Sequence, residues 1–151
     1  ILTQYDKYVI GRISKNCKST GVSDTFFSDG EAERTIRGTT EGFSEQFEAL
    51  CIVDYDTDFQ SIDLKTTSKP LHKFRFDANE LGYDIQAAVT QSINKKDFVF
   101  VVVQTVEPFD VGVFTCSDFF MDRGKTKVNK ALENYKFWGN KNQCQILNFE
   151  L

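Results

Sequence analysis

Two aspartates and a lysine near the middle of the chain have the types and spacing that phosphodiester hydrolysis needs. Asp54 ends a short apolar run, and Asp63 and Lys65 follow after an Asp-rich turn. A β-hairpin here would bring both carboxylates and the ammonium to one bend of the chain. Hydrolysis requires neutralisation of phosphate charge, a nucleophilic water and a stabilised leaving oxygen, and a divalent cation can serve all three needs.

The candidate metal ligands are Asp54, Asp63 and the main-chain carbonyl of Leu64. Mg²⁺ prefers such hard oxygen ligands, so we expect Mg²⁺ as the cofactor, with Mn²⁺ as a substitute. Lys65 lies two residues after Asp63, and on a strand both side chains would share a face. Its ammonium could then orient the attacking water or stabilise charge in the transition state. The Leu64 side chain would point the other way, into the core.

An isolated Asp-x-Lys is also typical of an ordinary protein surface. In that interpretation Asp56 and Asp58 form a turn, and Asp63 and Lys65 are an exposed pair on one face of a strand. Two observations favour a site: an upstream aspartate lies at hairpin distance, and a polar Thr-Thr loop precedes the next helix.

The surrounding pattern predicts an α/β fold, with a mixed central sheet flanked by helices. The expected helices cover 1–20, 71–93 and 117–138, and the expected strands cover 31–40, 43–53, 59–64, 98–104 and 111–115. The tail 143–151 is expected to be a short strand or an ordered edge. Within the middle helix, Leu81, Ile85 and Ala88 mark the face expected to pack inward.

Length and composition fit one domain over 1–151 with one hydrophobic core. The chain has 151 residues, of which 40% are hydrophobic, and it contains no run long and apolar enough to span a membrane. It begins at Ile1 without a signal peptide or an initiating Met, so we expect a fragment or a trimmed N-terminus. No two of the four cysteines form a C-x-x-C pair, so we expect reduced, mostly buried thiols and an intracellular setting.

Charge is distributed unevenly along the chain. The net charge is −4, which argues mildly against unspecific binding of nucleic acid. Residues 1–64 carry 6 basic and 12 acidic side chains, whereas 65–151 carry 12 basic and 10 acidic ones. An acidic cluster for a metal beside a basic surface for phosphates would have this distribution, and so would chance asymmetry on solvated faces.

Two segments resemble a known family. Ile-Asp-Leu-Lys-Thr-Thr at 62–67 and Gly-Tyr-Asp-Ile-Gln-Ala-Ala at 82–88 are similar to the PD-(D/E)XK nuclease superfamily. The likeness is strongest to RecE-like phage and prophage exonucleases, relatives of λ exonuclease and RecB-type nuclease domains, and it covers roughly residues 31–140. It implies a restriction-endonuclease-like core and metal-dependent cleavage of DNA.

The resemblance assigns roles to individual residues. Asp54 and Asp63 become metal ligands, and Lys65 becomes the catalytic lysine. Gln86 would contact the lysine, the water or the DNA, and Tyr83 would lie on nearly the same helical face, where it could instead be a packing aromatic.

Relatives also use an acidic residue or a histidine on an upstream element. Glu33 is the first candidate for that role and Glu31 the second, and both are equally explained as surface charges of a strand. Asp56 or Asp58 could replace Asp54 as the ligand, because the residues before Asp54 match the family motif imperfectly.

A basic segment follows the candidate site. Thr67, Lys69, Lys73 and Arg75 could hold backbone phosphates, or could form a solvated basic loop. His72 is the only histidine, and the absence of G-x-S-x-G and P-loop motifs excludes an α/β-hydrolase and an NTPase motor.

The function that the resemblance implies is an Mg²⁺-dependent exonuclease of phage or prophage recombination in the bacterial cytoplasm. Its partners would be DNA, a single-strand annealing protein and further copies of itself, with no membrane association. An endonuclease or junction resolvase on the same fold is one alternative. A catalytically silent nucleic-acid-binding or assembly module is the other, because the N-terminal helical region that grips DNA in relatives is short or missing.

Overall fold

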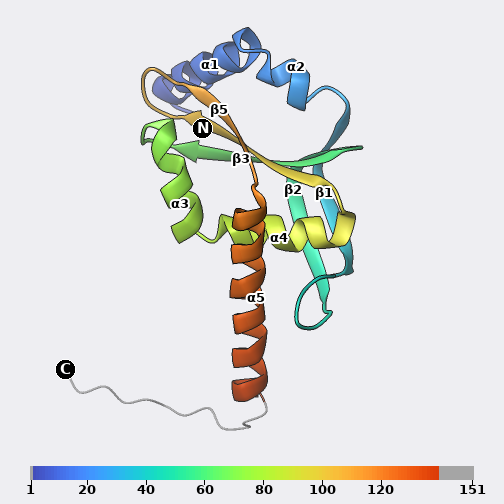
Figure 1. Ribbon diagram of the computed structural model, residues 1–151. Coiled ribbons are helices and arrows are strands. Elements are labelled where there is room, and N and C mark those ends of the chain that lie inside the picture. The colour runs from blue at the N-terminus through green and yellow to red at the C-terminus, as the bar shows by residue number, and fades with distance from the viewer. Residues whose placement is uncertain (1, 140–151) are drawn as a thin grey trace, which may run out of the picture.

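A five-stranded mixed sheet forms the centre of the protein. The computed structural model describes residues 2–139, and its strands lie in the order β1-β2-β3-β4-β5 (Figure 1). They are β1 (Gly30–Thr39), β2 (Glu48–Thr57), β3 (Gln60–Thr67), β4 (Asp97–Gln104) and β5 (Val111–Thr115). Among these strands β3 and β4 run parallel, and the other neighbouring pairs are antiparallel. The chain between β3 and β4 is helical, as the crossover of a parallel pair requires.

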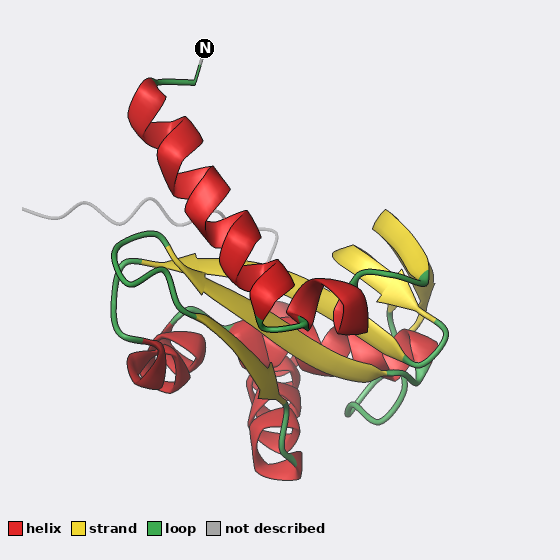
Figure 2. Ribbon diagram, turned by 90° about the horizontal axis from the view of Figure 1, so that it is seen from above, coloured by secondary structure: helices red, strands yellow, loops and turns green. Residues whose placement is uncertain are grey.

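Helices cover both faces of the sheet. They are α1 (Gln4–Ser19), α2 (Val22–Phe26), the 3-10 turn η1 (Leu71–Lys73), α3 (Phe74–Glu80), α4 (Tyr83–Asn94) and α5 (Asp118–Gly139). Helices α1 and α2 lie over one face, and α3, α4 and α5 lie over the other (Figures 1 and 2). In the described part of the chain no helix is both long and apolar enough to cross a membrane.

Strand β4 is buried along most of its length because both of its faces are covered. Phe98, Phe100 and Val102 pack with the core beneath α3, α4 and α5. Val99 and Val101 pack with the core beneath α2. A strand covered on both faces needs a continuous apolar run, so the strand predicted at 98–104 is confirmed.

The side chains of β2 change faces at Asp54. Val53 packs with the core beneath α4, whereas Tyr55 packs with the core beneath α2. Regular alternation would place these two side chains on one face. The pairing of β1 with β2 is interrupted at this point: Ala32 pairs with Tyr55 and Arg34 with Val53, but Glu33 and Asp54 between them do not pair. Glu33 has a φ of 52°, outside strand geometry. Asp54 therefore sits at a local distortion of the hairpin, with its side chain exposed.

The predicted order of helices and strands is confirmed, but several boundaries differ from the prediction. Strand β2 continues to Thr57 instead of ending at Val53, and β3 continues to Thr67 instead of ending at Leu64. The expectation of a loop at Thr66 and Thr67 is therefore wrong, because both residues pair with β4.

The segment after Gly21, expected as a loop, contains the short helix α2. The strand expected from Phe43 begins only at Glu48. The helix expected over 71–93 is divided, because Gly82 adopts a φ of 73° and caps the start of α4.

This division changes which side chains are buried. Leu81 and Ile85, expected on the inner face, are 63% and 37% exposed, whereas Ala87 and Ala88 pack inward. The prediction for Leu81 and Ile85 is therefore wrong, because the helix is interrupted at Gly82 and the two residues do not share the face of one continuous helix.

The structure describes three of the four cysteines and none of the C-terminal tail. The three described cysteines, Cys17, Cys51 and Cys116, are free thiols of intermediate burial, so the expectation that they are mostly buried is wrong for these three. Cys144 and the tail 143–151 lie outside the described residues.

Candidate active site

The candidate site lies toward the carboxyl end of β3, beneath α4. Asp63 and Lys65 alternate with Leu64 along the strand, so both point to the face that α4 covers. Asp63 is only 3% exposed. Its Oδ2 lies 2.6 Å from the Lys65 Nζ.

Helix α4 adds two further side chains to this pair. Gln86 Nε2 donates a hydrogen bond to Asp63 Oδ1 at 2.5 Å. The ring of Tyr83, one helical turn earlier, lies 4.5 Å from the Lys65 Nζ, which is cation–π geometry. The ammonium of Lys65 is thus held between a carboxylate and an aromatic ring, and its direction is restricted.

The electrostatics of Asp63 are unusual for a carboxylate beside a lysine. Burial raises the pKa of Asp63, the nearby charge of Asp54 adds to the rise, and the opposing influence of Lys65 and Gln86 does not cancel it. A raised carboxyl pKa means that the negative charge is under-compensated in the folded protein. The site therefore favours a bound cation.

Asp54 reaches the same region from the neighbouring strand. The register of β2 and β3 pairs Tyr55 with Ile62, so Asp54 comes next to Asp63 across the hairpin. Its Oδ2 accepts a hydrogen bond from the Leu64 amide at 2.6 Å. The carboxylate is thereby held against the strand that carries Asp63 and Lys65.

These donors fit a divalent cation such as Mg²⁺. Asp63 Oδ2 is buried, and no donor is aligned to form a hydrogen bond with it, although Lys65 Nζ is close. Lys65 compensates the charge of this oxygen in part, and a metal ion would complete its environment. Within residues 2–139 no group of three or more His, Cys, Asp or Glu side chains is arranged to hold a metal, so main-chain oxygens and water would complete the shell.

Three further residues predicted near the metal, Glu33, Glu31 and Leu64, are exposed. Glu33 is exposed and lies, like Asp54, where the pairing of β1 with β2 is interrupted, but among the described residues it belongs to no group of three acidic ligands. Glu31 is exposed and lies 3.8 Å from Arg34. The Leu64 side chain does point away from α4, but it is 45% exposed. The expectation that it enters the core is wrong, because this part of the sheet is incompletely covered.

The two turn aspartates separate into different roles. Asp58 lies in the bend between β2 and β3, as predicted. Asp56 is inside β2 and 2% exposed, so its assignment to the turn is wrong. Its carboxylate accepts a hydrogen bond from Ser61 at 2.7 Å and pairs with Lys96 and Arg34 at 2.7 and 3.1 Å. These contacts make Asp56 a structural residue and leave no free oxygen for a metal.

The predicted phosphate-binding residues follow β3 directly. Thr67 ends the strand, and its Oγ1 accepts a hydrogen bond from the Lys69 amide at 3.0 Å. Lys69 forms an exposed ion pair with Asp77 at 2.7 Å. Lys73 and Arg75 place their charges 5.8 and 4.7 Å from the ring centre of Phe76. His72 lies in η1, and it lines a surface hollow together with Gln104 at the end of β4.

Sequence reasoning missed the polar contact that fixes α4 to α5. Asp84 is 0% exposed and pairs with Arg123 at 2.6 Å and with Lys127 at 2.8 Å. A Cβ added to Gly124 would lie 2.0 Å from the Asp84 carbonyl oxygen, so the two helices are in close contact there. The signal in the sequence is a glycine beside two cations spaced four residues apart, which is one face of a helix.

The chain matches one protein family and is similar in structure to a solved protein. The family model described as "PDDEXK-like domain of unknown function (DUF3799)" matches residues 6–144. The chain belongs to this PDDEXK-like family. The PDDEXK-like domain is also similar in structure to a protein named "Putative exonuclease" from Eubacterium rectale. The TM-score is 0.68 at 15% identity, over 98% of this chain and 62% of that one.

Neither a second solved structure nor the curated proteins provide a relative from which a function can be argued. The structure of SSO0001 matches with a TM-score of 0.44 and 11% identity, over 89% of this chain and 62% of that one. No curated protein matches the chain.

Family membership and the shared fold confirm two sequence predictions for the PDDEXK-like domain. The resemblance to the PD-(D/E)XK superfamily is correct, and the α/β core is restriction-endonuclease-like. The chain spans 62% of the length of the Eubacterium rectale protein. Together the family and the fold support a nuclease.

Proposed function

We propose that this chain is a divalent-metal-dependent nuclease that hydrolyses phosphodiester bonds of DNA. The observation that carries the proposal is the contact of one buried carboxylate, Asp63, with both Lys65 and Gln86. A strand and a helix together hold an ammonium, an amide and a carboxylate within hydrogen-bonding distance. Such an arrangement is preorganised for a reaction in which negative charge develops.

Each residue has a definite part in this proposal. Asp54, Asp63 and the Leu64 carbonyl would hold a cation, which would neutralise phosphate charge and activate water. Gln86 fixes Oδ1 of Asp63, and Oδ2, which contacts Lys65 Nζ, would also face the cation. Lys65, restrained by Asp63 and by the ring of Tyr83, orients the attacking water or stabilises the phosphate oxygens.

Substrate contacts would come from neighbouring residues. Thr67, Lys69, Lys73 and Arg75 lie in the segment after β3 and supply donors for backbone phosphates. Glu33 remains a candidate for a further ligand because it lies at the same interruption of the β1–β2 pairing as Asp54.

The finer assignment is an Mg²⁺-dependent exonuclease, with Mn²⁺ able to substitute. It would act in phage or prophage recombination in the bacterial cytoplasm, with 1–151 as one domain. We infer partnership with a single-strand annealing protein and self-association from the RecE-like segments at 62–67 and 82–88. The name of the Eubacterium rectale protein agrees with exonuclease activity.

Degradation of linear and of covalently closed circular duplex DNA, with Mg²⁺ or with a chelator, tests the proposal. We expect cleavage of the linear form only, and a fall in rate of about 10³-fold for Lys65→Ala. The matched control is Lys130→Ala, which also removes one lysine charge but at an exposed position of α5, 65 residues after Lys65 in the sequence.

Two results would contradict parts of this proposal. Near-normal cleavage by Lys65→Ala would exclude the mechanism. Equal cleavage of circular DNA would replace the exonuclease with an endonuclease on the same fold.

A further inference from the structure

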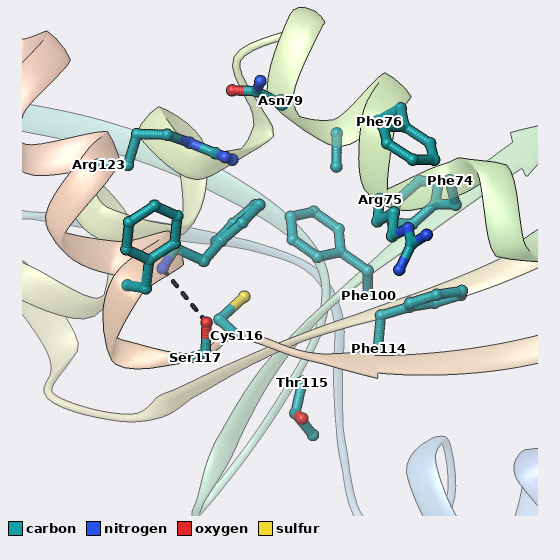
Figure 3. A pocket seen from close by; sticks show the side chains of 13 residues that line it. Phe74, Arg75, Phe76, Asn79, Phe100, Phe114, Thr115, Cys116, Ser117 and Arg123 are labelled. Atoms are coloured by element: carbon teal, nitrogen blue, oxygen red, sulfur yellow. Dashed lines mark hydrogen bonds between the residues drawn. The ribbon is translucent and has the colours of Figure 1, made fainter.

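A pocket with six phenylalanines in its lining lies between α3, β5 and the start of α5 (Figure 3). Its volume is about 450 Å³, within the range of sites that bind small organic molecules. Phe74, Phe100 and Phe114 form part of the wall from α3, β4 and β5. The pocket is therefore built by elements that are distant in sequence.

Two aromatic rings of the lining are exposed. Phe76 of α3 is 51% exposed and Phe119 of α5 is 75% exposed, although both line the pocket. Large apolar rings are costly to leave in water, and here they come from different helices around one cavity. Flat aromatic faces at such a site are suited to stacking on a planar ring of a ligand.

The charge of the lining is entirely positive. Arg75 and Arg123 both line the pocket, on opposite sides in the view of Figure 3, and no carboxylate does. Arg75 forms no ion pair with any residue between 2 and 139. Arg123 is paired through its Nε with Asp84, but its Nη2 is buried without a hydrogen-bond partner. The protein as a whole has a net charge of −4, so two arginines without a carboxylate make the pocket locally positive and suited to an anion.

The pocket adjoins the candidate active site. Phe100 lines the pocket and stacks on Tyr83, with ring centres 5.6 Å apart and an interplanar angle of 30°. Tyr83 in turn lies 4.5 Å from the Lys65 Nζ. The stacked rings of Phe100 and Tyr83 therefore connect the wall of the pocket to the lysine.

We propose that this pocket binds one unpaired nucleotide of the DNA strand next to the bond that is cleaved. Its base stacks among the phenylalanines, and Arg75 and Arg123 hold an adjoining phosphate. The inference rests on the proposed function, because it takes the occupant to be part of a DNA substrate. It adds a preference for strands with an unpaired end over blunt duplex.

The test is binding of fluorescein-labelled dT12 and of a blunt duplex to the full chain, followed by fluorescence anisotropy in the presence of a chelator. No metal and no cleavage are needed, so a failure of the nuclease proposal would not affect the measurement. We expect Phe119→Ala to raise the Kd for dT12 about 10-fold and to leave the Kd for the duplex nearly unchanged. Arg75→Gln should weaken dT12 binding and lower its salt dependence by about one phosphate contact.

The matched control is Phe59→Ala, because Phe59 is 80% exposed at the turn before β3, away from the pocket. Thermal unfolding of each variant verifies that it is folded. Equal Kd values for Phe119→Ala and Phe59→Ala would overturn the proposal. Competition by thymidine monophosphate as strong as that by dT12 would also overturn it, because the pocket would then bind a free nucleotide.

Discussion

Helix α4 contacts one buried aspartate, Asp63 of β3, and carries another, Asp84, which pairs with α5. The two aspartates differ in how well their charge is compensated. Toward the sheet, Gln86 contacts Asp63, whose pKa is raised mainly by burial. Toward α5, burial would raise the pKa of Asp84 as well, but its ion pairs with Lys127 and Arg123 outweigh burial and lower it. Both side chains are almost fully inaccessible, at 3% and 0% exposure.

The difference shows that burial alone does not identify a functional carboxylate. Asp84 has two cations and serves to fix α4 on α5, much as Asp56 serves to join β1, β2 and Lys96. Asp63 has one cation and an oxygen without an aligned donor. An under-compensated buried carboxylate is the one suited to bind a further cation.

The largest expected effect comes from Asp63→Asn, which removes the charge but keeps the shape. We expect the rate of DNA cleavage to fall about 10³-fold or more, because the proposed metal ligand and the partner of Lys65 are lost together. The midpoint of thermal unfolding should change little. Cleavage assays with Mg²⁺ and thermal unfolding of the same sample measure both, and near-normal cleavage would remove the distinction between the two aspartates.

The reverse result is expected for Asp84→Asn. The change leaves Arg123 and Lys127 without their buried partner and should lower the free energy of unfolding by about 2–3 kcal/mol. Cleavage at a temperature where the variant is folded should persist. Denaturant unfolding gives the stability change, and a loss of activity in fully folded Asp84→Asn would show that this side of α4 also serves the site.

A smaller effect on stability is expected for Gly124→Ala. The added Cβ would meet the Asp84 carbonyl oxygen at 2.0 Å, so α4 and α5 must separate, at a cost of about 2 kcal/mol. Gly11→Ala is the matched control, because nothing lies within 4 Å of a Cβ added in α1. It should be neutral or slightly stabilising. Equal stability of the two variants would contradict the close contact of α4 and α5.

The smallest expected effect is on the pH dependence of stability without metal. The raised pKa of Asp63 means that its contribution falls as pH rises from the ordinary value of 3.8 toward the raised one. The lowered pKa of Asp84 has the opposite sign: its contribution is present above pH 3.8 and is lost as pH falls through the lowered value. Unfolding of wild type, Asp63→Asn and Asp84→Asn at a series of pH values separates the two, and slopes of the same sign would refute the comparison.

Much of the fold was predictable because it depends on local periodicity. The apolar run at 98–104 indicated a strand covered on both faces, and β4 has that environment. The proposed positions of Asp63 and Lys65 on one face of a strand, and of Tyr83 and Gln86 on one face of a helix, also follow from backbone repeats. Features that depend on distant contacts were not predictable. Asp56 resembles a turn residue in the sequence, and only Arg34 and Lys96 make it a buried ion pair.

The amino-acid sequence by itself determined the element types and the spacing of the Asp-x-Lys and Tyr-x-x-Gln residues, because strand and helix repeats are properties of the local backbone. The tertiary structure decided which buried aspartate is paired with one cation and which with two, and where the β1–β2 pairing is interrupted near Asp54. It also decided that residues of α3 and α5 enclose an aromatic pocket. These features depend on burial and on partners far along the chain. Burial and ion pairing are set only when the layers pack together.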